Sequence, residues 1–206
     1  MTVSKREHWD HIYETKGATK LSWFQAVPSR SMTMIRDTGV PAEAPIIDVG
    51  TGVSSLIDVL LNSDYSNINV LEISTAAIAE CRARIGDAAS RVKWMQADVL
   101  EWAPKTRYYL WHDRAVFHFL TDRAHVNTYL DTLRTALVPG GYFVLATFGP
   151  EGPDCCSGFD VQRYSIEQLS HLLEDDFELK YYELEDHTTP TGNVQQFLYS
   201  TWQMNG

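Results

Sequence analysis

The sequence predicts an open α/β fold in which helices cover both faces of a mostly parallel sheet. Short apolar runs that resemble strands alternate with helical segments up to residue 148. A glycine turn follows the first of these runs, at the point where a parallel strand would pass into a helix. The last two strand-like runs, 177–187 and 195–203, have no helix between them, so we expect them to form an antiparallel edge hairpin.

Hydrophobic periodicity gives the elements in order. Helices are predicted at 4–16, 29–38, 54–63, 75–87, 123–137 and 165–176, and strands of the parallel part at 44–50, 67–74, 91–99, 108–113 and 141–148. A turn-rich loop is predicted at 149–160. With the edge hairpin, these strands make a sheet of seven.

Composition limits the classes of function. The chain has 206 residues, enough for one domain with a sizeable core. Its formal net charge of -10 argues against a nucleic-acid partner, because phosphate binding needs clustered Lys and Arg. No window approaches the ~18 apolar residues of a membrane span, and the polar N-terminus lacks the apolar core of a signal peptide, so we expect a cytoplasmic protein without a membrane partner.

The three cysteines do not form a recognisable framework. An odd and low count does not suit a set of disulfides. Cys155 and Cys156 are neighbours, which is not the spacing of a zinc site, so we predict no metal.

The stretch "IIDVGTGVSSL", 46–56, places Gly50 and Gly52 just after a strand. Glycine permits positive φ and lets backbone amides approach a ligand. A tight turn without any ligand is an equally good explanation of these two glycines alone. Two acids favour a ligand: Glu72 ends the second strand, where a carboxylate can accept both hydroxyls of a ribose, and Asp98 ends the third.

A nicotinamide dinucleotide fits this turn less well than another nucleoside cofactor. Its fingerprint needs a third glycine at position 55, where this chain has Ser55. Asp48, just before the turn, suits a ligand that carries an ammonium group and no pyrophosphate. S-Adenosylmethionine has an amino-acid tail, a sulfonium, a ribose and an adenine.

Taken together, these motifs resemble those of class I S-adenosylmethionine-dependent methyltransferases. "DVGTGVS" resembles the acid-x-Gly-x-Gly-x-Gly motif, with Ser54 in place of the last glycine, and "LEIS", "ADV" and "LVPGGYFVLATF" resemble the motifs that follow it. The resemblance implies a Rossmann-like core at 45–148, a lid segment at 1–40, and a substrate loop, helix and edge hairpin at 149–206. The cofactor-binding residues that it implies are Asp48, Gly50, Thr51 and Gly52 at the methionine part, Glu72 and Ile73 at the ribose, Asp98 and Val99 at the adenine, and Trp9, Tyr13 and Trp23 in the lid.

The fourth strand continues into "WHDRAVFHFL", which resembles a segment of the thiopurine methyltransferase family, with Ala115 in place of its glycine. The lid resembles that of this family and of small lysine methyltransferases. The likeness implies that Asp113 and Arg114 face the substrate, although a structural ion pair is an alternative for both. His112 and His118 are candidate general bases, since imidazole titrates near neutral pH. His118 lies in an apolar run that is typical of a packed side chain, so His112 is the better candidate.

Further substrate contacts are predicted around the loop after the fifth strand and in the lid. These residues are Phe24, Cys156, Arg163, Tyr164 and His187. Packing in the core or helix capping is the alternative for each.

Three functions remain open from the sequence. The first is S-methylation of a small thiol or sulfide, for which the thiopurine-like segment is typical. The second is N-methylation of a protein lysine, since an acidic surface attracts a basic partner. The third is a regulator that binds the cofactor without catalysis.

Overall fold

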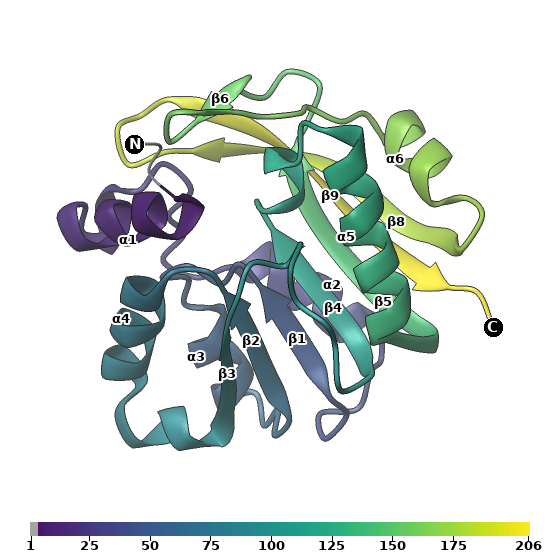
Figure 1. The fold of residues 1–206 in the computed structure, drawn as a ribbon, viewed down its shortest axis with the longest axis horizontal. Helices are drawn as coiled ribbons and strands as arrows, with labels where there is room; N and C mark the ends of the chain where they lie inside the picture. The colour runs from purple at the N-terminus through teal and green to yellow at the C-terminus, as the bar shows by residue number, and fades with distance from the viewer. Residues whose placement is uncertain (1–3) are drawn as a thin grey trace.

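A computed structural model describes residues 4–206 as a seven-stranded sheet with helices on both faces (Figure 1). Residues 1–3 of the predicted lid segment lie outside the described residues. The strand order is β3-β2-β1-β4-β5-β9-β8. All pairs from β3 to β5 are parallel, and β9 runs antiparallel to β5 and β8. The predicted fold, including the antiparallel edge hairpin, is therefore confirmed.

The elements fall close to their predicted ranges. The strands of the main sheet are β1 (Ile46–Val49), β2 (Ile68–Glu72), β3 (Val92–Gln96), β4 (Tyr108–Arg114), β5 (Leu137–Phe148), β8 (Phe177–Thr188) and β9 (Val194–Met204). The α-helices are α1 (Lys5–Thr15), α2 (Ser29–Asp37), α3 (Leu56–Asn62), α4 (Thr75–Ile85), α5 (Arg123–Ala136) and α6 (Ile166–Leu173). Three short 3-10 helices are η1 (Ala18–Lys20), η2 (Gly86–Arg91) and η3 (Phe117–Phe119).

Two elements differ from the prediction. β5 begins at Leu137, directly after α5, because Leu137 already pairs with Tyr108 before an irregularity in the β4–β5 register. The predicted loop at 149–160 contains a small hairpin of β6 (Cys155–Cys156) and β7 (Phe159–Asp160).

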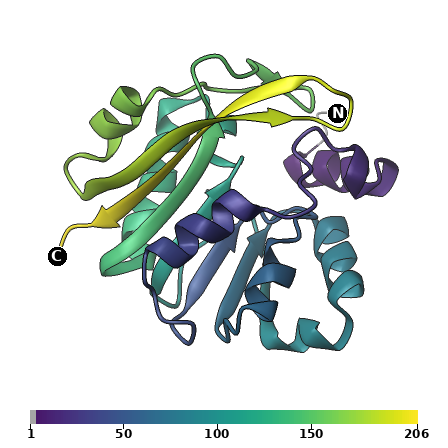
Figure 2. The same cartoon turned by 180° about the vertical axis from the view of Figure 1, so that it is seen from behind.

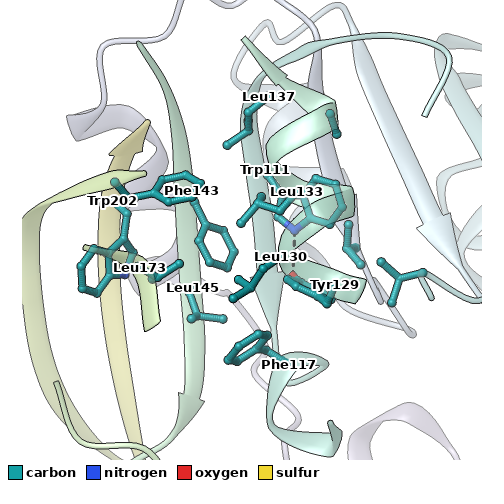
Figure 3. Packing of buried hydrophobic residues seen from close by; sticks show 14 of the residues in the cluster. Trp111, Phe117, Tyr129, Leu130, Leu133, Leu137, Phe143, Leu145, Leu173 and Trp202 are labelled. Carbon is teal, nitrogen blue, oxygen red and sulfur yellow. Dashed lines mark hydrogen bonds between the residues drawn. The ribbon is translucent and has the colours of Figure 1, made fainter. Parts of the chain in front are cut away.

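Helices α5 and α6 cover one face of the sheet, and α2 and α3 cover the other (Figures 1 and 2). The core under α5 and α6 is rich in aromatic side chains, among them Trp111, Phe143 and Trp202 (Figure 3). Burying one side chain of this size stabilises the fold by roughly 2–3 kcal/mol. Within the described part of the chain, no helix combines the length and apolar character needed to cross a lipid bilayer.

The alternation of side chains along β4 determines what reaches the site. Trp111 and Asp113 point toward the α5 side, whereas His112 and Arg114 point to the other face. Successive residues of one strand therefore serve different layers of the molecule.

Candidate active site

A cavity of about 360 Å³ lies at the carboxyl ends of the parallel strands, with α1 along its rim. This is the usual place for a ligand in an open α/β sheet. One part of its lining, which we call the strand-end half, consists of Asp48, Val49, Gly50, Thr51, Leu71, Glu72, Ile73, Ala97, Asp98 and Val99. The other part, the aromatic half, consists of Trp9, Trp23, Arg114, His118, Phe119, Phe148, Cys156, Phe159 and Phe197.

Asp48 enters the cavity with one oxygen already paired. Its Oδ1 lies 2.6 Å from His112 Nδ1, and His112 Nε2 lies 2.9 Å from Ser31 Oγ on α2. Asp48 Oδ2 is buried and has no partner. A buried carboxylate oxygen without a hydrogen bond is costly, so this atom suits a ligand that donates, such as an ammonium group.

The glycine turn has the backbone that only glycine adopts easily. Gly50 has φ +67° and Gly52 has φ +51°. A Cβ on Gly50 would clash with Val116 Cγ2, and one on Gly52 would lie 2.6 Å from the Tyr13 hydroxyl oxygen. The turn thus leaves a cradle between β1 and the lid that a side chain would fill.

Glu72 supports the turn from the end of β2. It accepts hydrogen bonds from the backbone N–H of Gly52 and of Ser74, each at 2.8 Å. Burial raises the pKa of Glu72 to about 7, because the charged form loses its hydration. Each carboxylate oxygen still has a second lone pair for a ligand hydroxyl.

Asp98 lies at the opposite end of the strand-end half. Its Oδ1 accepts from the Leu100 N–H at 3.0 Å, and its Oδ2 lies 3.3 Å from Lys5 Nζ of α1. Thr51, also in this half, has a buried hydroxyl oxygen without a partner. The acids, the glycine cradle and two unpartnered oxygens therefore fit a cofactor with an ammonium and hydroxyl groups.

Helix α1 lies over this cavity as the predicted lid. Asp10 of α1 accepts from Ser74 Oγ at 2.7 Å and from the Ala76 N–H at 3.0 Å, so it binds the N-terminal end of α4. His8 contacts the backbone oxygen of Ser157 at 2.9 Å. The lid is thus held to both the cofactor side and the loop after β5.

Three of the four aromatic residues predicted in the lid reach the cavity. Trp9, Tyr13 and Trp23 line the cavity. The rings of Trp9 and Tyr13 stack with 6.0 Å between centroids. Phe24 packs against the same cluster but does not line the cavity, so the structure gives it no direct contact with a substrate there.

The three residues predicted as catalytic are separated by the structure. Arg114 lines the cavity, with Nη2 donating to Trp23 O at 2.8 Å. Asp113 faces away from the cavity, which corrects its predicted contact with substrate. It accepts from the Tyr129 hydroxyl at 2.5 Å, and burial raises its pKa to about 6. His112 lines the cavity, but both of its ring nitrogens are engaged by Asp48 and Ser31, so it is not available as a general base.

Of the residues predicted near the loop, the structure brings only Cys156 to the cavity. Burial raises the pKa of its thiol. Arg163 is exposed and donates to Gly152 O at 3.4 Å, and the Tyr164 ring is buried in the core under α5. His187 is buried with Nε2 2.8 Å from Ser22 O, off the cavity wall. Within residues 4–206, no group of three His, Cys, Asp or Glu side chains is arranged to hold a metal.

Several lining residues are not apparent from sequence patterns, and His118 is apparent there only as the weaker candidate for a general base. His118, Phe119, Phe148, Phe159 and Phe197 come together only through packing of distant segments. The segment "DRAVFHF" carries one local signal. The family segment that it resembles has glycine in place of Ala115, and a glycine at that position indicates a backbone with positive φ. Ala115 has φ +76°, a conformation that costs about 1–2 kcal/mol for a residue with a Cβ.

Comparisons with known proteins agree with this geometry. Residues 46–141 match a family model described as a methyltransferase domain. The chain is 24% identical to EEF1A lysine methyltransferase 2 of Homo sapiens over 203 residues, which cover 91% of this chain and 78% of that protein. It is 31% identical to the Mus musculus protein of the same name, over 84 residues that cover 37% of this chain and 34% of that protein.

Solved structures share the fold across nearly the whole chain. A methyltransferase from Anabaena variabilis ATCC 29413 superposes with a TM-score of 0.75, at 14% identity over 97% of this chain and 93% of that one. The N-methyltransferase NodS from Bradyrhizobium japonicum WM9, in complex with S-adenosylhomocysteine, has a TM-score of 0.70, at 14% identity over 97% and 100%. A third structure was solved in a study of the conversion of a disulfide bond into a thioacetal group during echinomycin biosynthesis. It superposes with a TM-score of 0.74, at 16% identity over 97% of this chain and 93% of that one.

Proposed function

This protein is a class I S-adenosylmethionine-dependent methyltransferase, and we propose that its acceptor is a small molecule with a soft nucleophile, such as a thiol. The bound cofactor supplies a methyl group on a sulfonium, which a nucleophile displaces directly. The protein then has to hold the acceptor in line and exclude water.

Among the described residues of the aromatic half, no buried side chain offers a free base, and this observation carries the proposal. His112 is engaged on both nitrogens, and Asp113 faces the core. Burial lowers the pKa of His118 to about 3, so its ring does not take up a proton near neutral pH. Asp160 lines the cavity but is exposed on β7. A thiol, with an ordinary pKa of about 8.5, ionises without strong assistance.

In this proposal the strand-end half holds the cofactor. Asp48 Oδ2 accepts from the ammonium group, and the Gly50–Gly52 turn lies against the methionine part with Thr51. Glu72 and Ile73 contact the ribose, and Asp98 and Val99 contact the adenine. Trp9 and Tyr13 of the lid exclude water from the reacting sulfur.

Lysine N-methylation of a protein is the second candidate, and the names of the two relatives favour it. An ammonium acceptor would first have to lose a proton to a base. The lid side of the cavity is also lined mainly by aromatic rings, and no described carboxylate lies within 4.0 Å of Arg114. A regulator without catalysis does not accord with the methyltransferase domain.

The test uses S-adenosylmethionine labelled on its transferable methyl. The purified protein is incubated with a panel of small thiols and, separately, with a cell extract whose proteins and small molecules are then separated. Label on a thiol supports the proposal. Label confined to a discrete protein band, and carried on lysine, would overturn it in favour of the second candidate. Asp48→Ala is the control that should show no transfer.

A further inference from the structure

Arg114 carries a charge without a counter-ion. Among residues 4–206 no carboxylate lies within 4.0 Å of its guanidinium. Its Nη2 donates to Trp23 O at 2.8 Å and its Nε to the Tyr199 hydroxyl at 3.3 Å. These two bonds fix the plane of the group. A guanidinium has five N–H donors, so others remain for a ligand in the cavity that Arg114 lines.

His118 provides a second donor whose proton position is fixed by the backbone. The Phe148 N–H donates to His118 Nδ1 at 3.2 Å, so the proton of the neutral ring is on Nε2. The side chain is buried and lines the cavity, yet Nε2 has no hydrogen-bond partner. Burial and the nearby Arg114 charge lower the pKa of His118 to about 3, which keeps this tautomer neutral. A buried N–H without an acceptor suits a ligand oxygen.

The two donors belong to one wall. The His118 ring stacks on Phe148 with 4.4 Å between centroids and 17° between planes. Phe148 contacts Phe197 at 4.8 Å between centroids, and the Arg114 guanidinium carbon lies 5.4 Å from the centre of the Phe197 ring. The aromatic rings pack against both donors, and their low polarity strengthens a charge-assisted hydrogen bond made there.

We propose that Arg114 and His118 form a subsite for a carboxylate on the acceptor molecule. A carboxylate has two oxygens and accepts only, which matches a planar cation beside a neutral N–H donor. An ammonium group would instead meet a positive charge and a second donor. This inference deepens the proposed function by naming the acceptor as an acidic small molecule, and it rests on that function for the position of the reacting group.

The first test measures binding and needs no turnover. The full chain is saturated with S-adenosylhomocysteine and titrated with 3-phenylpropanoate or with 3-phenylpropylamine, which share an aromatic body and differ in charge. We expect the carboxylate to bind at least ~10-fold more tightly than the amine, because only the carboxylate can accept from both donors. Equal binding of the two probes, or tighter binding of the amine, would overturn the subsite.

Two variants assign the preference to the two residues. Arg114→Gln and His118→Phe should each weaken binding of the carboxylate several-fold. Neither should weaken binding of the amine, and Arg114→Gln should strengthen it, because the positive charge that repels the ammonium group is gone. His118→Gln retains an amide donor and should recover part of the loss. Arg123→Gln removes an exposed arginine outside the cavity and should change neither value. Uniform weakening of both probes in the two cavity variants would mean that they act on the fold and would refute the assignment.

A turnover test separates this inference from the proposed function. 3-Mercaptopropanoate and propane-1-thiol carry the same thiol, but only the first has a carboxylate. We expect a lower KM for the first, and His118→Phe should raise that KM with the affinity for S-adenosylhomocysteine unchanged. Transfer to both thiols with equal KM would contradict the subsite alone. Binding of the carboxylate probe without transfer to any thiol would contradict the proposed function alone.

Discussion

The two halves of the cavity are built in different ways. The strand-end half comes from three short stretches, 48–51, 71–73 and 97–99, each at the end of one strand of the same sheet. The aromatic half draws on the lid, the segment after β4, the end of β5, the β6–β7 hairpin and β9. The first depends on backbone geometry and a few acids, and the second on the packing of side chains from distant segments.

The halves also differ in electrostatics. The strand-end half contains the carboxylates of Asp48, Glu72 and Asp98, whereas the aromatic half contains the Arg114 guanidinium, and the β6–β7 hairpin adds the exposed carboxylate of Asp160. A positively charged cofactor and an acidic acceptor would each meet the opposite charge. The difference teaches that one end of the cavity can be altered with little effect on the other, and the following predictions test that independence.

The largest effect is expected at Asp48. Asp48→Ala removes the free oxygen and leaves His112 without its partner, which should raise the Kd for S-adenosylhomocysteine at least ~100-fold, or about 3 kcal/mol, in a calorimetric titration. Ser31→Ala is the matched control, because it removes the other hydrogen bond of His112 and spares Asp48. If Ser31→Ala weakens binding as much, Asp48 acts through the fold and not through the cofactor.

The halves should respond to pH with opposite sign. The pKa of Glu72 is raised from 4.5 to about 7, so its contribution to stability is full below pH 4.5 and is lost as the pH rises through 7. Over that window the unfolding free energy of the protein without cofactor should fall by about 3 kcal/mol more than that of Glu72→Gln. Denaturant titrations at several pH values measure the difference.

The pKa of His118 is lowered from 6.5 to about 3, which gives the reverse dependence. Its contribution to stability is full above pH 6.5 and is lost as the pH falls toward 3. Relative to His118→Phe, the wild-type protein should lose up to about 3 kcal/mol between pH 6.5 and 4.5. Parallel pH curves for wild type and either variant would refute the pKa shift that burial gives to that group.

Tyr129→Phe tests whether Asp113 belongs to the core and not to the site. The Tyr129 hydroxyl accepts from Trp111 Nε1 at 2.9 Å (Figure 3). It also donates to Asp113, so its loss leaves two buried polar groups short of a partner. We expect the unfolding free energy to fall by about 2 kcal/mol, with the Kd for S-adenosylhomocysteine unchanged within about twofold. If the variant is fully folded under the assay conditions and that Kd still rises strongly, Asp113 belongs to the site after all.

The smallest effect is expected in the lid. Asp10→Ala removes two hydrogen bonds to the start of α4 and should speed dissociation of S-adenosylhomocysteine about fivefold in stopped-flow measurements, equivalent to about 1 kcal/mol. Lys5→Ala breaks an exposed ion pair with Asp98 and should change the rate less than twofold. Equal acceleration by both variants would show that the Asp10 contacts have no special part in closure.

The sequence was sufficient for the fold and for the strand-end half because both follow from local patterns. Alternating strands and helices specify a parallel sheet, and residues that end neighbouring parallel strands meet at one edge. The sequence therefore predicts that Asp48, Glu72 and Asp98 lie at one edge of the sheet, and all three line the cavity.

The aromatic half could not be predicted in the same way. Asp113 and Arg114 are adjacent in sequence, yet the alternation of the strand sends one to the core and the other to the cavity, and the faces become clear only with the helices in place. His118 lies in an apolar run that suggests simple packing. Its donor is apparent only once the Phe148 N–H is seen to occupy the other nitrogen.

The β6–β7 hairpin offers a practical handle for protein engineering. It contributes Cys156, Phe159 and Asp160 to the cavity wall. It forms its own two-stranded sheet, and neither of its strands pairs with the seven-stranded sheet that contains Asp48 and Glu72. A library of variants restricted to residues 154–160 would change one side of the aromatic half and leave the strand-end half, with its cofactor contacts, unchanged. Selectivity for new acceptors could then be screened against a constant background of cofactor affinity.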